Sequence, residues 1–210
     1  MPDAEQQPQA TNQNKQKAQK KAEPTLPPSN GPFGLEAGLT KEKIDDMAGV
    51  TLSPIEGETG LYLAEALPKK NSSFDVHALR ISPVVGLCQI RAVGKDVDAD
   101  SFGIEIRSSF DNLKESLDSL YGKGKKEDYL MPGSMWKESK YWMMALKEKE
   151  RFYSASWVTP TDAMKASKIA QIYMDARTRD GSKAFVYLQY DFINNATCVQ
   201  ETKQAKQDSL

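Results

Sequence analysis

The chain has 210 residues, with 28 Lys and Arg against 29 Asp and Glu and a formal net charge of -1. This balance argues against a dedicated nucleic-acid-binding protein, which needs a strongly basic surface. The longest apolar runs, such as residues 84–88, fall far short of the ~20 residues that a membrane-spanning helix requires. We therefore expect no transmembrane segment, and the length predicts one domain or two small ones.

Polar stretches flank the predicted domain, which extends from residue 31 to residue 199. Residues 1–30 contain six Gln, five Pro and four Lys but no aromatic residue, so they bury too little apolar surface to offset the entropy of ordering. We predict a disordered linker there, with contact to phosphate or anionic lipid through the lysines as the alternative. Residues 200–210 are equally polar and are predicted to form a frayed tail.

Two segments of the chain align without gaps, residues 33–44 and residues 102–113. Each predicts a short strand with the pattern Phe-Gly-aliphatic-Glu, then a hydroxyl N-cap at Thr40 or Ser109 and an acidic residue in the first helical turn. The helices expected from these signals are residues 41–48 and residues 110–121. The alignment predicts a degenerate tandem repeat, and chance similarity is the alternative.

Downstream of each helix the apolar residues alternate with a period of two, which indicates antiparallel strands. The last pair of strands encloses Asp180-Gly181, a strong hairpin signal. The hairpins expected are residues 74–81 with 87–93, residues 142–146 with 151–158, and residues 169–176 with 183–192. The prediction is an α+β fold of two helix-then-antiparallel-sheet units, about residues 33–98 and 102–198, that form one continuous body.

The motif Gly34-Leu35 to Leu39-Thr40, and the order of one helix followed by antiparallel strands twice over, resemble the tandem architecture of the β-lactamase inhibitor protein family. A single unit is similar to small outer-membrane assembly lipoproteins of the BamE/SmpA type. The strings at residues 86–88, 121–122, 133–136 and 190–192, with the later Cys198, resemble an uncharacterised family of bacterial proteins, for which export is one alternative. These resemblances imply non-catalytic scaffolding or inhibition, and they assign no site residue.

His77 is the only histidine, so any Ser-His-Asp or Cys-His arrangement depends on it. Strand alternation places it on one face with Asp75 and Leu79 and predicts a half-exposed side chain. The chain has no Gly-Lys-Ser/Thr phosphate loop and no Gly-x-Ser-x-Gly motif, which are common signatures of enzymes. We expect no catalytic residue and no cofactor, and a hydrolase that relies on His77 is the enzyme alternative.

Asp96, Asp98 and Asp100 come nearest to a metal-binding pattern. An EF-hand loop that began at Asp96 would need Gly at its sixth position and an acidic residue at its twelfth, where this chain has Ser101 and Arg107. We predict a solvated turn and no metal site, with a bound cation as the alternative.

Cys88 and Cys198 are the only cysteines. Because Cys88 lies on a predicted strand and Cys198 follows the last strand, a disulfide would tie the sheet of the first unit to the end of the chain. One disulfide is the expectation for an oxidising compartment, and two unrelated buried thiols are the alternative for the cytosol. Redox chemistry is disfavoured, since no Cys-x-x-Cys motif is present.

Aromatic residues gather between Tyr129 and Trp157, and most of them must belong to the core. The segment around Met131, Met135 and Trp136 instead predicts a loop. Rigid aromatic and adaptable methionine side chains suit a contact with another protein. We predict that this loop is a binding site, and the alternative is that Trp136 covers the core.

The N-terminal segment allows two predictions for the compartment of the protein. Met1 is followed by polar residues where a secretory signal would be apolar, which predicts a cytoplasmic protein. A spacer rich in Gln and Pro is also typical of the stretch after a cleaved signal, which predicts a periplasmic or exported protein instead.

Three hypotheses for the function follow. The first is a non-enzymatic protein-binding or scaffold domain of the bacterial cell envelope, which would contact another protein through a sheet face or through the loop with Trp136. The second is an immunity or inhibitor protein that acts on a toxin or a secreted enzyme. The third is the hydrolase that relies on His77.

Overall fold

A computed structural model describes residues 29–47 and 49–208 of the chain. The predicted linker lies outside the described residues as far as residue 28. The helices are η1 (Pro32–Gly34), α1 (Lys41–Asp45), α2 (Ile104–Tyr121), η2 (Ser139–Tyr141), α3 (Trp142–Lys147), α4 (Asp162–Ala166) and α5 (Asn195–Asp208). The strands are β1 (Leu52–Pro54), β2 (Leu61–Ala64), β3 (Phe74–Ser82), β4 (Gly86–Gly94), β5 (Val97–Asp98), β6 (Lys125–Leu130), β7 (Arg151–Trp157), β8 (Ile169–Thr178) and β9 (Lys183–Phe192).

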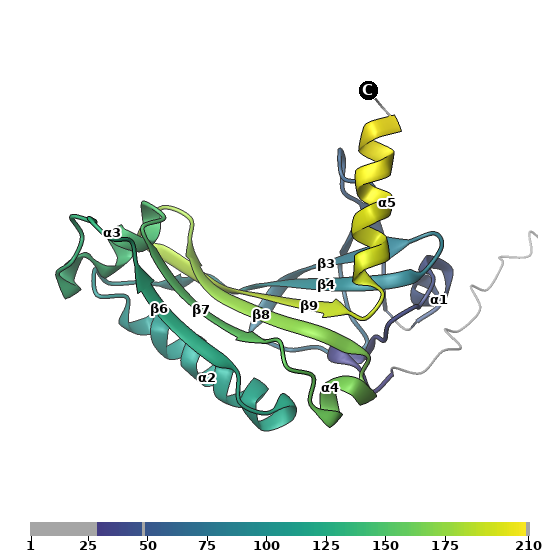
Figure 1. Ribbon diagram of the computed structural model, residues 1–210, viewed down its shortest axis with the longest axis horizontal. Helices are drawn as coiled ribbons and strands as arrows, with labels where there is room; N and C mark the ends of the chain where they lie inside the picture. Colours follow the sequence, from purple (N-terminus) through teal and green to yellow (C-terminus); the bar gives the residue numbers. More distant parts are fainter. Residues whose placement is uncertain (1–28, 48, 209–210) are drawn as a thin grey trace, which may run out of the picture.

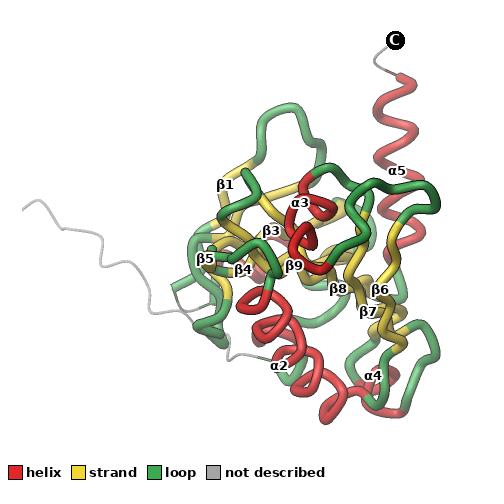
Figure 2. Tube along the Cα trace, turned by 90° about the vertical axis from the view of Figure 1, so that its left-hand side faces the viewer, coloured by secondary structure: helices red, strands yellow, loops and turns green. Residues whose placement is uncertain are grey.

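The strands form one antiparallel sheet in the order β1-β2-β3-β4-β9-β8-β7-β6, with the short β5 beside β9. Each half of the sheet is a meander of consecutive strands, β1 to β4 and β6 to β9, and the last strands of the two meanders pair with each other. In Figures 1 and 2, α2 and α4 lie below the sheet and α5 rises on its other side. The α+β prediction is confirmed, and the two predicted units share one continuous sheet.

The sheet ends on one side at β6, whose residues are almost all exposed. This strand begins with four charged residues, Lys125 to Asp128. Charged side chains are common on edge strands, because they discourage pairing with further strands.

Two of the three predicted hairpins are confirmed, β3 with β4 and β8 with β9. The turn between β8 and β9 is formed as its sequence predicts. Gly181 has a φ of 93°, and the Asp180 carboxylate accepts hydrogen bonds from the backbone amides of Ser182 and Lys183 at 2.9 Å each. The predicted strand at 142–146 is wrong, because these residues begin helix α3. Trp142, Met143 and Leu146 are all buried, which fits helical spacing, and a short apolar run does not distinguish a helix from a strand.

The starts of the two predicted helices differ from expectation. Thr40 caps α1 as predicted, its side chain accepting a hydrogen bond from the Lys43 amide, and α1 ends at Asp45. In the second unit Ser109 is not a cap, because α2 already begins at Ile104, where the Asp100 carboxylate accepts a hydrogen bond from the first helical amide at 3.0 Å. The predicted strands at 33–36 and 102–105 do not form, so the aligned segments take different structures.

The hydrophobic core lies between the sheet and the helices below it. Helix α2 buries Ile106, Phe110, Leu117 and Tyr121 at helical spacing, and α3 and α4 add Trp142 and Met164 to the same core. Burial of side chains of this size stabilises a fold by roughly 1.5–3 kcal/mol each. The largest fully buried side chains include Phe110, Leu35, Ile44, Leu79, Ile90, Met174 and Phe192, which come from both units.

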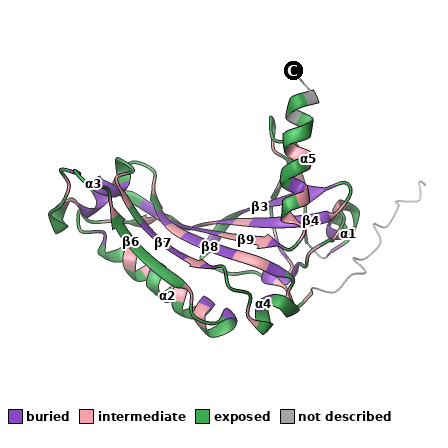
Figure 3. Ribbon diagram, viewed as in Figure 1, coloured by how far each residue is buried: buried purple, intermediate pink, exposed green. Residues whose placement is uncertain are grey.

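The expected frayed tail at 200–210 is corrected, because α5 continues to Asp208. Among the described residues, no helix has the length and apolar character that a membrane crossing needs. The base of α5 is held against the sheet by Asn194, which donates hydrogen bonds to the carbonyls of Val85 and Leu87, and by Arg80, which donates to Thr202 at 3.1 Å. Its far end is largely exposed (Figure 3).

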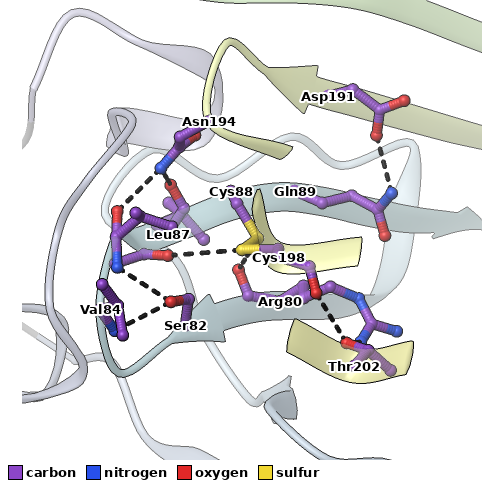
Figure 4. Close-up of a disulfide and its surroundings, with 12 residues drawn as sticks. Arg80, Ser82, Val84, Leu87, Cys88, Gln89, Asp191, Asn194, Cys198 and Thr202 are labelled. Carbon is purple, nitrogen blue, oxygen red and sulfur yellow. Dashed lines mark hydrogen bonds between the residues drawn. A yellow bond between two sulfur atoms is a disulfide. The ribbon is translucent and has the colours of Figure 1, made fainter. Parts of the chain in front are cut away.

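The predicted disulfide between Cys88 and Cys198 is present, with an S–S distance of 2.08 Å (Figure 4). A β-bulge in β4 positions Cys88 for this bond. Arg80 pairs with Gln89 and Ile81 pairs with Leu87, which leaves Cys88 as the extra residue. Leu87 belongs to the core, and the bulge turns Cys88 toward α5 on the opposite face.

We expect the disulfide to be a major source of stability, because it joins residues separated by 110 positions. In the chain-entropy model, closing a loop of about 100 residues is worth up to ~4.7 kcal/mol. The double variant Cys88→Ser/Cys198→Ser, which leaves no lone thiol, should unfold at a lower urea concentration than the oxidised protein and exchange its α5 amide protons faster. Equal stability of the two proteins, or two alkylated thiols in the unreduced wild type, would contradict this expectation.

Candidate functional site

The two faces of the sheet differ in what covers them. On β7, β8 and β9 every second residue packs on the helices below, as Tyr153, Met174 and Leu188 do. Residues that pair across antiparallel strands lie on the same face, so the register defines the opposite face as well. We call this the open face, and its side chains include Lys125, Glu127, Tyr129, Phe152, Ser154, Tyr173, Asp175, Arg177, Tyr187, Gln189, Asp191, Gln89 and Arg91.

A chain of hydrogen bonds crosses the middle of the open face. Arg91 donates to Gln89 at 2.5 Å, and Gln89 donates to Asp191 at 2.7 Å. On β9, Tyr187 donates to Gln189 at 2.8 Å, and Gln189 donates to the same Asp191 at 3.0 Å. These bonds fix the side chains of the two strands at which the meanders join.

The network continues onto β8 through Arg177. Its guanidinium carbon lies 3.7 Å from the centre of the Tyr187 ring, and its Nε donates to Asp175 at 2.9 Å. Tyr173 donates to the other carboxylate oxygen of Asp175 at 3.2 Å. Burial raises the pKa of Asp175 in spite of the favourable charge of Arg177, and burial together with the charge of Asp175 raises the pKa of Tyr173 to about 12.

Aromatic side chains are exposed where the open face reaches its edge. Tyr129 and Phe152 are cross-strand partners with ring centroids 6.2 Å apart, and they are 49% and 43% exposed. An adjacent pair of half-exposed aromatic rings is typical of a surface that another molecule covers.

The loop that contains Trp136 follows β6 and continues from this aromatic edge. Met135 is 75% exposed and Met131 is 42% exposed. Trp136 is half-buried, and its ring packs edge-on against Tyr141 at 5.5 Å. Trp136 is absent from the buried core cluster, so the structure places the loop at the surface, directly after edge strand β6.

Turn hydrogen bonds hold the same loop in shape. Ser134 is buried, its amide donates to the Met131 carbonyl at 3.1 Å, and its hydroxyl accepts a hydrogen bond from the Trp136 amide at 3.1 Å. The methionines are therefore presented from an ordered turn.

His77 is buried and not half-exposed, which corrects the prediction. His77 lies on the same face of β3 as the fully buried Leu79, and this face packs on the core, whereas Val76 on the other face is 40% exposed. The register shift between Phe74 and Val76 allows Phe74 to reach the core as well. The imidazole packs edge-on against Phe33 at 4.9 Å. Its Nε2 has no hydrogen-bond partner among the described residues, and burial lowers its pKa.

The three aspartates near β5 are engaged separately. Asp96 pairs with Arg179 at 2.9 Å, Asp98 pairs with Lys183, and Asp100 caps α2. In the part of the chain that the structure describes, no group of three or more His, Cys, Asp or Glu side chains is arranged to hold a metal ion.

Comparison of the chain with protein-family models, with curated proteins and with solved structures finds no match. The candidate site is therefore defined by the geometry of this molecule alone.

Sequence reasoning missed the polar network of the open face. The signal was present, because Tyr173, Asp175 and Arg177 alternate with buried apolar residues on β8 in the way that a two-sided strand requires. That the side chains of neighbouring strands interlock depends on the pairing of β4 with β9, which no local pattern predicts.

We expect His77 to make the protein less stable in mild acid. Its folded pKa lies below the ordinary value of 6.5, so the unfolded chain takes up a proton before the folded one does. The free energy of unfolding should therefore fall as the pH decreases below that value. Urea unfolding of the wild type and of His77→Gln between about pH 7 and about pH 5 should show a shallower decline for the variant, and parallel declines would contradict a buried neutral His77.

Truncation of Trp136 should destabilise the protein less than truncation of Trp142, which is only 3% exposed. A fully buried Trp typically loses about 3–5 kcal/mol on replacement by Ala, whereas the half-buried Trp136 should lose roughly half as much. Urea unfolding of Trp136→Ala and Trp142→Ala measures the difference, and equal losses would assign Trp136 to the core.

Proposed function

We propose that the protein is a non-enzymatic protein-binding or scaffold domain, and that the open face together with the loop from Met131 to Trp136 is its binding surface. The observation that carries this proposal is the exposed Tyr129 and Phe152 pair beside an ordered network of Tyr, Arg and Gln side chains.

The residue types support a protein as the ligand. Interfaces between proteins are enriched in Tyr, Phe, Met and Arg, and their strongest contacts are usually aromatic or Arg side chains. The open face supplies the exposed Tyr129, Phe152 and Arg177, and the loop adds exposed methionines.

Pre-ordering supports it as well. Fixing mobile side chains on binding costs conformational entropy and therefore weakens the affinity. Tyr187, Gln189 and Asp191 are already fixed by mutual hydrogen bonds, and Arg177 is stacked on Tyr187. A partner that contacts them has less entropy to overcome.

The disulfide supports an oxidising compartment, since such bonds persist mainly in exported proteins. We place the proposed activity in the bacterial cell envelope on this ground. An inhibitor or immunity protein is the second candidate, and it is favoured by the joining of two meanders into one extended face, as the resemblance to the β-lactamase inhibitor protein family implies. A gene for a toxin or a secreted hydrolase beside the gene for this chain would favour the inhibitor.

Site-specific photo-crosslinking tests the surface. A benzophenone amino acid in place of Phe152, on the oxidised full-length chain, should yield one discrete protein adduct in cells that encode the protein. The matched control has the same group in place of Leu120, an apolar residue of α2 that is 63% exposed on the other side of the sheet. The adduct should be absent there.

Two results would contradict the proposal. One is the same adduct pattern from both positions, which would indicate random encounters. The other is the absence of any discrete adduct from Phe152. Measurable turnover of a substrate that His77→Ala abolishes would then favour the hydrolase.

A further inference from the structure

A pocket of about 350 Å³ opens at the corner where α3 ends and β7 and β8 meet. Phe152 and Asp175 of the open face form part of its wall. It therefore continues the proposed binding surface and adds a recess to it. Its charged lining residues are Lys147, Lys149, Arg151, Arg177 and Asp175.

Four of these five charges are positive. Asp175 is engaged by Arg177, and Arg151 donates through one nitrogen to Asp128 at 3.0 Å. Neither Lys147 nor Lys149 takes part in an ion pair within the described part of the chain. Their ammonium groups are available to a negatively charged ligand.

In the turn after α3, basic and acidic residues alternate along the sequence, but they point in different directions. Residues 147–150 read Lys-Glu-Lys-Glu, yet only the lysines line the pocket. Lys149 has a φ of 59°, in the left-handed region that non-glycine residues rarely adopt. This conformation closes the turn and leads the chain into β7, with Lys147 and Lys149 both on the pocket wall.

Resting on the proposed function, we infer that this pocket takes the carboxylates of an acidic segment of the partner protein. Lys and Arg bind carboxylates through charge-assisted hydrogen bonds. Phe152 at the rim, with Tyr129 beside it, would contact the apolar part of the same segment.

The charge distribution favours an acidic protein segment over a nucleic acid. Beyond the pocket the open face carries charges of both signs, because Asp191 and Glu127 lie among Arg91 and Lys125. A phosphate backbone would meet these carboxylates along its length, whereas a short acidic segment meets only the pocket.

The test uses the pentapeptide acetyl-Glu-Glu-Tyr-Glu-Glu-amide as the probe, with acetyl-Gln-Gln-Tyr-Gln-Gln-amide as its neutral match. Titration of the oxidised full-length chain, followed by amide chemical shifts in NMR, should show shifts confined to the pocket corner for the acidic peptide. The affinity should fall with added salt, and the neutral peptide should bind at least tenfold more weakly.

Lys149→Gly is the decisive variant, because it removes the charge while relieving the left-handed backbone. Its matched control is Lys168→Gly, at a residue with a φ of 54° in the turn after α4, which does not line this pocket. Both variants should fold at least as stably as the wild type. Only Lys149→Gly should lower the affinity for the acidic peptide. The expected decrease is about tenfold, which is the effect of losing one charge-assisted contact.

Several outcomes would overturn the inference. They are equal binding of the two peptides, equal effects of the two glycine variants, and binding of inorganic sulfate at the same residues as tightly as the acidic peptide. If the Phe152 adduct forms equally well in Lys149→Gly, the pocket inference fails while the proposed function stands. If the peptide binds but Phe152 yields no adduct, the proposed function fails and with it the protein partner.

Discussion

The antiparallel pairing of β4 with β9 joins the two meanders, and most of the molecule depends on it. Ile90 pairs with Tyr190 and Ala92 with Leu188, and all four side chains are buried in one core. Phe33, from the start of the first unit, packs against Tyr190 at 6.1 Å. Because a small meander alone buries too little apolar surface for stability, each half supplies what the other lacks.

Because one face of the sheet is buried against the helices, the residue types on the other face are constrained. The apolar residues of β8 and β9 face the helices, so the intervening positions carry polar and aromatic groups. Where β4, β9 and β8 adjoin, these groups bond to one another, as Gln89 does to Asp191. The disulfide fixes α5 over the first meander, and the proposed binding surface lies mainly on the second.

Local patterns predicted the elements that local chemistry determines. These include the hairpin around Asp180-Gly181, the Thr40 cap and the α+β class. Features that depend on distant contacts could not be predicted in this way. His77 is buried because the face of β3 that it shares with Leu79 packs on the core, which shows only in the folded structure. The apolar residues from Trp142 are helical where α3 packs on the same core. The disulfide was predicted from the even number of cysteines and not from their geometry.

The edge strand β6 has a consequence for how copies of this protein meet. Two identical antiparallel strands that extend a sheet are related by a two-fold axis perpendicular to it, so residues of the same face align and one residue must oppose its own copy. Near the middle of β6 that residue is Glu127 or Asp128, and like charges directly opposite each other repel. The strand therefore resists growth of the sheet by self-addition, which leaves the adjoining open face accessible to a different protein.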